Sequence, residues 1–419
     1  MATHITKKLI SQPLFTTNSF STTSASYVAS RFRDPTFEKL MDKYKNLLKI
    51  YSIQDLILAN PNINPPSISI DFLTRLSQKL HLNRGPTAFL RKYPHIFEIF
   101  YDPLKSQPLC KLTPKAVALY QEEGLAIECS LGVVIDRLVR ILSMSVSKRV
   151  PLRAVFKVWR ELGLPDDFED SVISKHPHIF RLSNNVSEVN THMLELVSVV
   201  EKGSLVSAVE NWRVLEVCKE DCSVDRSGIR FSFKHGFPPG MKLKKNFRAK
   251  VREWQSLEYI GPYEEMGVKS KSKRGMKGLE KRAVGIVHEF LSLTVEKMVE
   301  VEKISHFRSW FGIELNIRDL FLDHPGMFYM STKGKRHTVF LREAYERGCL
   351  IDPNPVYVSR RKLLELVAMG KRGFSGNSAM LRTGYENSSG EQSEGCLENL
   401  HMFGHLIFYI LKFTPLNLV

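Results

Sequence analysis

Apolar residues near the start of the chain recur at the spacing of one helix face. After Asp34-Pro35 they stand at i, i+3, i+4 and i+7 intervals, and they are Phe37, Leu40, Met41, Tyr44, Leu47 and Leu48. Charged residues fill most of the intervening positions. The pattern predicts an amphipathic helix, and we place the beginning of folded structure at Asp34-Pro35.

A second pattern occurs three times along the chain: an apolar helical segment runs into a Pro and is followed by clustered Ile, Phe, Tyr or Met. Residues 89–97, 175–180 and 324–329 read FLRKYPHIF, KHPHIF and HPGMFY. The ring of proline pushes the preceding residue out of the α region and ends a helix there. The apolar cluster that follows suits a short strand.

The residues around the first copy predict a helix, a β-hairpin and a second helix. The strand stops at Asp102-Pro103, an apolar return run follows at 109–112, and Thr113-Pro114 begins a helix that we expect to end at Gly124. In the third copy the turn is 331–336, the return strand is 337–340, and the second helix is expected to end at Gly348. The return strand of the second copy is harder to find, and 193–200 fits best.

A helix pair with a hairpin beside it is the outline of a winged-helix-like module, a shape that is often used on nucleic acid. The predicted fold class is therefore α+β, predominantly helical with short β-hairpins, in repeated modules. Uneven spacing argues against a regular solenoid. Outline alone does not give function, and the three prolines also fit core-forming units whose Phe and Ile side chains are simply buried.

These patterns divide the chain into six parts. We expect an organelle transit peptide at 1–33, modules at 34–130, 131–235 and 283–369, a basic helix and loop at 236–282, and a low-complexity, disordered tail with a short apolar end at 370–419. The third module opens with a long amphipathic helical stretch predicted over 283–311. The apolar run at 406–411 is too short to span a bilayer, which takes about 20 apolar residues.

Composition adds a polyanionic partner to this picture. The chain has 419 residues, 43% of them apolar, and carries a net charge of +16 with a pI near 9.5. Such charge indicates nucleic acid or an acidic membrane surface. Six cysteines without paired metal-ligand spacing are too sparse for a disulfide scaffold, so we expect reduced thiols.

The first 33 residues contain no Asp or Glu and are rich in Ser and Thr, with Lys7, Lys8, Arg31 and Arg33 supplying charge. That composition is typical of an organelle transit peptide. A secretory signal needs a continuous apolar core, which is missing here. A plain disordered tail is the alternative.

Positive charge is concentrated between residues 240 and 282. Thirteen Lys or Arg stand there against five acidic residues, which is half of the net charge in about a tenth of the chain. Residues 241–254 predict a basic helix, and its candidate RNA-binding side chains are Lys242, Lys244, Lys245, Arg248, Lys250 and Arg252. Phe247, Val251 and Trp254 either stack on unpaired bases or face the core, and their spacing favours the core.

Two further places offer cations to a phosphate backbone. Lys333, Lys335 and Arg336 crown the third hairpin, where a wing reaches nucleic acid, and Arg91 with Lys92 precedes the first Pro. Scattered basic residues are more often only solvated.

The motifs of catalysis are missing. No P-loop, dinucleotide fingerprint or nucleophile elbow occurs, and His288-Glu289 lacks the second His of a zinc-protease helix because position 292 is Ser. Cys218, Cys222 and His235 lack a fourth metal ligand at suitable spacing. We expect no enzyme, no metal and no cofactor.

An ordered series of segments resembles the plant organelle RNA recognition domain family. The series comprises Arg33-Asp34-Pro35, the 89–97 element with Leu112-Thr113-Pro114, the 175–180 copy, GMKLKKNF at 240–247 followed by Trp254-Gln255 and Pro262-Tyr263, and the 324–329 copy. The match runs from about residue 33 to about residue 367. Beyond Met369 the chain departs from the pattern.

The resemblance implies a nuclear-encoded plant protein that is imported into an organelle, binds group II intron RNA and promotes its splicing alongside other splicing factors, without catalysis of its own. No membrane association is expected. The Arg pair and the short leader favour the mitochondrion over the chloroplast. Two alternatives remain open: a DNA-binding protein of the organellar nucleoid, and a protein-interaction scaffold of the organellar ribosome or membrane.

Overall fold

The computed structural model describes residues 33–59, 65–103, 106–184, 192–198, 203–219, 229–238, 240–258, 260–265, 273–334 and 336–373. The predicted transit peptide, apart from Arg33, and the end of the predicted tail from residue 374 lie outside the described residues.

Three units share one order of elements: a helix, a short strand, two helical segments and a hairpin. The first contains α2 (Pro35–Leu58), β1 (Ser67–Ser69), α3 (Ile70–Arg75), α4 (Pro86–Arg91), β2 (Phe97–Asp102) and β3 (Gln107–Leu112). The second contains α6 (Leu131–Met144), β4 (Arg149–Pro151), α7 (Leu152–Leu162), a π-helical turn (Glu169–Ile173), β5 (Phe180–Asn184) and β6 (His192–Leu196). The third contains α10 (Lys273–Leu293), β7 (Met298–Glu300), α11 (Val301–Ser305), α12 (Ile317–Asp323), β8 (Phe328–Ser331) and β9 (Thr338–Leu341).

Each unit forms a three-stranded antiparallel sheet in which the last strand lies in the centre. β3 pairs with both β1 and β2, β6 with β4 and β5, and β9 with β7 and β8. The return strand of the second copy is β6, close to its predicted place. The α+β fold class is confirmed, and the strand order fits the winged-helix-like outline.

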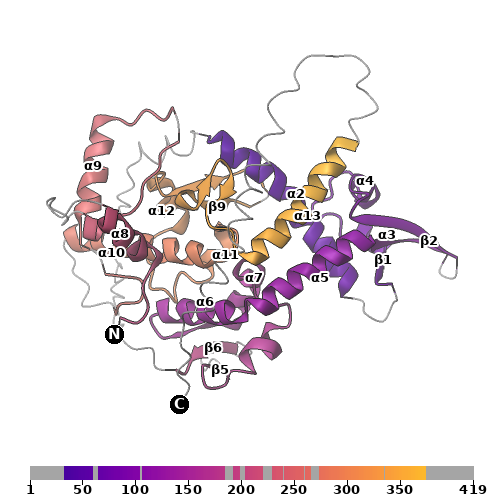
Figure 1. The fold of residues 1–419 in the computed structure, drawn as a ribbon, viewed down its shortest axis with the longest axis horizontal. Helices are drawn as coiled ribbons and strands as arrows, with labels where there is room; N and C mark the ends of the chain where they lie inside the picture. Colours follow the sequence, from indigo (N-terminus) through magenta and orange to yellow (C-terminus); the bar gives the residue numbers. More distant parts are fainter. Residues whose placement is uncertain are drawn as a thin grey trace, which may run out of the picture.

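Four further helices join or flank the units: α5 (Pro114–Cys129), α8 (Ala208–Lys219), α9 (Lys245–Ser256) and α13 (Pro355–Gly373). A small hairpin of β10 (Tyr345–Glu346) and β11 (Cys349–Leu350) precedes α13. Figure 1 shows α5 and α13 side by side across the middle of the molecule, and α9 at one edge.

The first predicted helix begins where the sequence indicates. The Asp34 side chain caps α2 by accepting from the Thr36 N–H at 3.0 Å, and Pro35 occupies the first turn. The predicted face is buried, except that Leu48 is half-buried. The pattern of apolar residues was therefore sufficient for this helix.

Two predicted helix ends were wrong. α5 continues through Gly124 to Cys129, because the buried Glu123 and Ile127 on either side of the glycine pack in the interior and offset its low helix propensity. Gly348 does not stop a helix: it lies in the turn of the β10–β11 hairpin with φ of +85°.

Two predicted helical stretches were also wrong in extent. The stretch 283–311 is broken after Leu293, where residues 298–300 pair with β9 as strand β7. Residues 67–69, which lie between the first predicted helix and the first copy of the repeat, pair with β3 as strand β1. The basic helix begins at Lys245 instead of residue 241, and α13 extends four residues into the predicted tail.

The hydrophobic core does not divide along the predicted module boundaries. One cluster combines the second and third units, and another combines the first unit with α13 and with Met298, Tyr329 and Phe340 of the third sheet. The six-part division therefore stays a prediction, and the described modules share their interiors.

Buried polar contacts hold the first and last elements together. Arg342 pairs with Asp34 at 2.8 Å, and Glu38 of α2 accepts from the Tyr329 and Ser331 hydroxyls of β8. Arg360 of α13, 2% exposed, binds Glu123 at 2.7 Å and Glu296 at 2.8 Å. These contacts join α2, α5 and α13 to the third unit.

Candidate nucleic-acid interface

The basic helix α9 is fixed to the body through its second half. The Trp254 ring lies 5.5 Å from the Phe233 ring and 4.6 Å from the His324 ring, between centroids. Gln255 accepts from the Phe233 N–H at 2.7 Å and donates to the Phe233 carbonyl oxygen at 2.8 Å. The apolar side of the helix thus packs inward, as its spacing predicts.

A buried lysine caps the end of α9. Lys281 of α10 has no exposed side-chain surface, and its ammonium group donates to the carbonyl oxygens of Trp254 at 2.9 Å, Gln255 at 2.8 Å and Leu257. Carbonyl oxygens at the end of a helix lack most intrahelical donors; the Trp254 oxygen also accepts from the Leu257 N–H at 3.2 Å. The cation supplies further donors and suits the negative end of the helix dipole. Burial lowers the pKa of Lys281 to about 7.

The segment before α9 lies against the His-Pro-Gly element of the third unit. The Gly236 N–H donates to the Gly326 carbonyl oxygen at 2.8 Å. A Cβ atom at Gly326 would lie 2.5 Å from His235 and 2.8 Å from Phe237. The third copy of the repeat therefore carries Gly after its Pro because another backbone segment crosses it closely.

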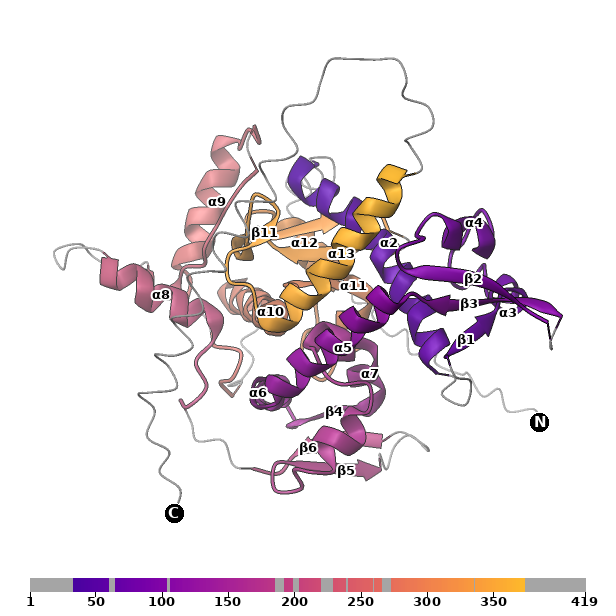
Figure 2. The same cartoon turned by 45° about the vertical axis from the view of Figure 1, so that its right-hand side comes forward.

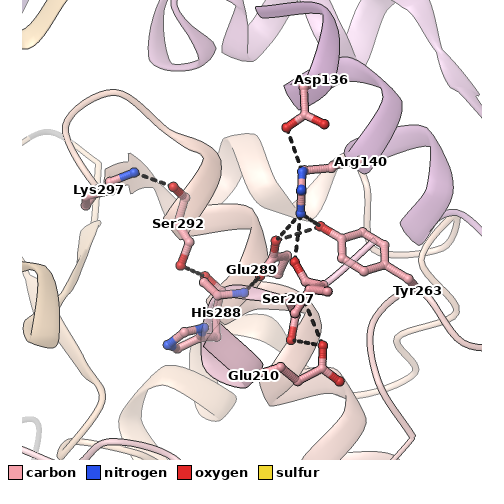
Figure 3. Close-up of polar contacts among 11 residues, drawn as sticks. Asp136, Arg140, Ser207, Glu210, Tyr263, His288, Glu289, Ser292 and Lys297 are labelled. Carbon is pink, nitrogen blue, oxygen red and sulfur yellow. Dashed lines mark hydrogen bonds and ion pairs between the residues drawn. The ribbon is translucent and has the colours of Figure 1, made fainter. Parts of the chain in front are cut away.

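A polar cluster holds the segment around α8 (Figure 3). Glu289 of α10 accepts from the Ala208 N–H of α8 at 2.7 Å and from the Tyr263 hydroxyl at 2.6 Å. Arg140 of α6 donates to the Val206 carbonyl oxygen at 2.9 Å and to Asp136 at 2.7 Å. The residues 206–263, which include α8 and α9, are in this way tied to α6 and α10.

The predicted cations lie on α9 and on the residues that lead into it, with Lys242 and Lys244 before the helix and the other four on it. All six predicted side chains are solvent-exposed, and none of them forms an ion pair with a described residue; they are Lys242, Lys244, Lys245, Arg248, Lys250 and Arg252. Lys245, Arg248 and Arg252 are spaced by three and four residues, which places them on one face. Trp254 and Phe247 lie on the opposite face, so binding to the body leaves these charges free.

Other cations of the basic run have structural roles that the sequence did not reveal. Lys281 and Arg282 are buried and donate to backbone carbonyl oxygens, Arg282 to that of Gly261. Lys277 pairs with Glu253 at 2.7 Å. Only their place in the chain could have indicated this role. All three lie on α10, a helix whose apolar residues recur at helical spacing beyond these positions.

The predicted wing cations are already paired. Lys333 binds Asp42 and lies 3.6 Å from Glu38, both on α2, and Arg336 lies 3.0 Å from Glu302 and 3.4 Å from Glu300. Lys335 is outside the described residues. The third hairpin packs on α2, so its described cations contribute little unpaired charge.

Arg91 and Lys92 lie at the far end of the molecule from α9. Arg91 is exposed on α4, and the half-buried Lys92 has its ammonium 5.8 Å from the centroid of the Tyr93 ring. α4 and α9 occupy opposite ends of the long axis in Figure 1, and the turned view in Figure 2 keeps them apart.

The described residues form none of the ligand groups that a metal site needs, and His235 and His288 have structural partners. No group of three or more His, Cys, Asp or Glu side chains there could hold a metal ion. His288 pairs with Glu343 at 2.6 Å, and Glu289 caps α8. Burial lowers the pKa of His235 to about 4, and its Nδ1 lies 3.0 Å from the Phe233 carbonyl oxygen. Cys222 lies outside the described residues.

The described residues form an α+β protein of winged-helix-like units with an unpaired cationic helix face, and such charge is typical of proteins that bind polyanions. The chain belongs to the plant organelle RNA recognition domain family, whose model matches residues 32–372. The resemblance seen in the sequence is thereby confirmed.

Named plant proteins are similar over most of the chain. Protein ROOT PRIMORDIUM DEFECTIVE 1 of Arabidopsis thaliana is 39% identical over 84% of this chain and 86% of its own length. Protein WHAT'S THIS FACTOR 1, chloroplastic, of Zea mays is 30% identical over 88% and 71%. Protein WHAT'S THIS FACTOR 9, mitochondrial, of Arabidopsis thaliana is 28% identical over 87% and 89%. No solved structure matches this chain.

The family and these relatives support an organellar, RNA-related role in plants. Both chloroplastic and mitochondrial relatives occur, so the similarity does not select one organelle. Among the described residues, no helix is long and apolar enough to cross a bilayer.

Proposed function

We propose that the protein binds organellar group II intron RNA through the exposed face of α9 and promotes splicing without catalysing it. The single observation that carries the proposal is six exposed cations without ion-pair partners among the described residues, two just before α9 and four on it, while the Trp254 side of the helix is anchored. Phosphates of RNA would replace the missing counter-charges, and each contact would release condensed counterions.

The position of these cations supports the proposal that they bind an anionic ligand and do not serve to stabilise the fold. Lys244 and Lys245 stand at the positive, N-terminal end of α9, where no side chain caps the helix and no acidic residue lies in the first turn. Cations there oppose the helix dipole and weaken the helix. An anion bound beside them would remove that cost, so RNA binding and helix stability would be linked.

Binding would favour splicing by population shift. A protein that contacts the splicing-competent shape of an intron better than its alternatives raises the fraction of RNA in that shape. The intron would supply the chemistry, with other organellar splicing factors as partners. We place the protein in the mitochondrion, with the chloroplast as the alternative, on the composition of the first 33 residues.

The test compares two variants with the same change in charge. In the α9 variant, Lys242, Lys244, Lys245 and Arg248 become Gln. In the control variant, four exposed lysines outside residues 240–256 become Gln: Lys39, Lys43, Lys157 and Lys175. Filter binding to an intron transcript is measured over a range of salt concentrations.

The α9 variant should bind more weakly and lose roughly 0.7 of the log–log salt slope for each lost single-strand phosphate contact. The control variant should keep the wild-type slope. An unchanged slope in the α9 variant rejects this surface, and equal competition by duplex DNA supports the nucleoid alternative. Loss of the protein should leave intron-containing transcripts unspliced in isolated organelles. The wild-type and control chains should restore splicing, and the α9 variant should not.

A further inference from the structure

The three units differ in charge along the segment that joins the first and second strands of each sheet. In the first unit this segment, residues 70–96, has five Lys or Arg against one acidic residue. In the second unit the segment is 152–179, with four Lys or Arg against five acidic residues. In the third unit it is 301–327, with three Lys or Arg against four acidic residues. Only the first unit is basic at the place where winged-helix-like modules carry their helix pair.

These cations of the first unit are unpaired among the described residues. Arg75, Lys79, Arg84 and Arg91 are all exposed, and no ion pair to a described residue is formed by any of them. In the second unit, by contrast, Arg160 pairs with Asp55 at 2.6 Å. The charge of the first unit is therefore presented to solvent, whereas in the second unit Arg160 is paired and the exposed Lys157 and Lys175 stand in a segment with five acidic residues.

The first unit also has exposed aromatic rings at two positions, whereas the exposed Phe156 of the second unit packs against Phe168, with ring centroids 4.7 Å apart. Phe72, the third residue of α3, is 45% exposed, and Tyr101, the fifth residue of β2, is 63% exposed. At the third helical position the other units have Ala154 and Lys303, and at the fifth strand position the second unit has Asn184. Phe72 and Arg75 are three residues apart on α3 and share a face.

Exposed rings beside cations suit unpaired nucleotides, because every base can stack while the cations contact its phosphates. We propose that this first-unit surface, defined by Phe72, Arg75, Lys79, Arg84, Arg91 and Tyr101, is a second RNA-binding surface that takes a single-stranded segment of the same RNA bound by α9. The proposal rests on the proposed function of α9.

Two surfaces at opposite ends of one folded body would bridge separate segments of an RNA. α4 and β2 lie at one end and α9 at the other in both Figure 1 and Figure 2. Binding at one surface makes binding of a linked segment at the other intramolecular, which raises affinity without a new contact. The bridge would bring segments that are distant in an intron into one complex.

The first test counts binding sites with a short probe at low salt. An oligo-uridine of about 12 nucleotides falls within the size bound by one single-strand surface. The wild-type chain should bind two probes. A first-unit variant with Arg75, Lys79, Arg84 and Arg91 changed to Gln should bind one, the α9 variant should bind one, and the control variant should bind two.

The second test uses a longer probe. An unstructured RNA of about 60 nucleotides, long enough to reach both surfaces, should lose roughly 100-fold in affinity in the first-unit variant, because simultaneous binding is lost. Saturation of the wild-type chain at one short probe overturns the proposal, as does a first-unit variant that matches the control variant with both probes.

The outcomes separate this proposal from that for α9. If only the α9 variant is weakened, the α9 surface stands and the first-unit surface is rejected; if only the first-unit variant is weakened, the reverse holds. If the first-unit variant does not fold, ultraviolet crosslinking of the wild-type chain to oligo-uridine decides. Crosslinks to the peptides that contain Phe72 and Tyr101 are expected, and crosslinks confined to 240–256 overturn the proposal.

Discussion

Lys281 contacts Trp254 in two ways: its ammonium group donates to the Trp254 carbonyl oxygen at 2.9 Å and lies 4.9 Å from the centroid of the indole ring. Changing Lys281 to Met should remove the ammonium donor from three carbonyl groups, of which that of Trp254 keeps the Leu257 N–H. We expect the free energy of unfolding to fall by about 1.5–3 kcal/mol. Chemical denaturation measures the loss, and hydrogen exchange should accelerate at 254–258.

The same variant tests whether anchoring matters to RNA. Since Lys281 is buried, its replacement removes no phosphate contact, so any fall in RNA affinity comes from a loosened α9. The salt slope should stay at the wild-type value while affinity falls. A reduced slope would show instead that Lys281 reaches RNA directly.

Gly326→Ala should displace the segment that leads into α9. The added Cβ would lie 2.5 Å from a His235 ring atom, which the packed site accommodates only by moving, at a cost of about 1–3 kcal/mol. Thermal unfolding measures this cost. Gly124→Ala is the matched control, because nothing lies within 4 Å of a Cβ there and α5 should gain about 0.5–1 kcal/mol in helix propensity.

Arg360→Met should be strongly destabilising. It would leave Glu123 and Glu296 buried without their cation, a change that typically costs about 3–5 kcal/mol. Lys362→Met on the same helix removes the partially exposed pair with Glu122 and should cost about 0–1 kcal/mol. Equal unfolding midpoints for the two variants in denaturant would contradict the structural role of Arg360.

Stability should depend on pH through His288. Burial lowers the pKa of His288, but the Glu343 carboxylate 2.6 Å from Nε2 outweighs burial and holds the pKa above its ordinary value of 6.5. A group whose pKa is higher in the folded state than in the unfolded state contributes its full stabilisation at pH values below the unfolded-state pKa. That contribution is lost as the pH rises through the folded-state pKa. The stability difference between wild type and His288→Gln should therefore shrink as pH increases above 6.5.

A matched substitution separates this effect from a general one. His95 is exposed, and His95→Gln should stay within about 0.5 kcal/mol of wild type throughout the same pH series. A wild-type advantage over His288→Gln that grows with pH would show that the pair does not hold a proton in the folded state.

Local sequence predicted the elements whose ends are chemically marked. Asp34-Pro35 begins α2, and Gly163, in the left-handed region with φ of +68°, ends α7. Gly124 misled the prediction because a glycine inside a helix costs only about 1 kcal/mol, which packing around it outweighs. Strands β1 and β7 were missed because three residues acquire their conformation from a partner strand distant in the chain.

In the candidate site too, local features were predictable from the sequence and contacts between distant residues were not. The basic run and the inward face of α9 were readable from composition and spacing. The separation of free cations from structural ones was not, since Lys281, Lys333 and Arg336 look like their neighbours until their partners are known. Neither Glu289 nor Tyr263 carried a signal of its role.

The sequence by itself determined the family, the repeated pattern, and the concentration of positive charge between residues 240 and 282. Those properties depend on residue types and short spacings along the chain. Only the tertiary structure decided which charges face solvent, because a cation is neutralised by groups that lie near it in space. Lys333 meets Asp42 across 291 positions, whereas Lys245 meets no described acidic group.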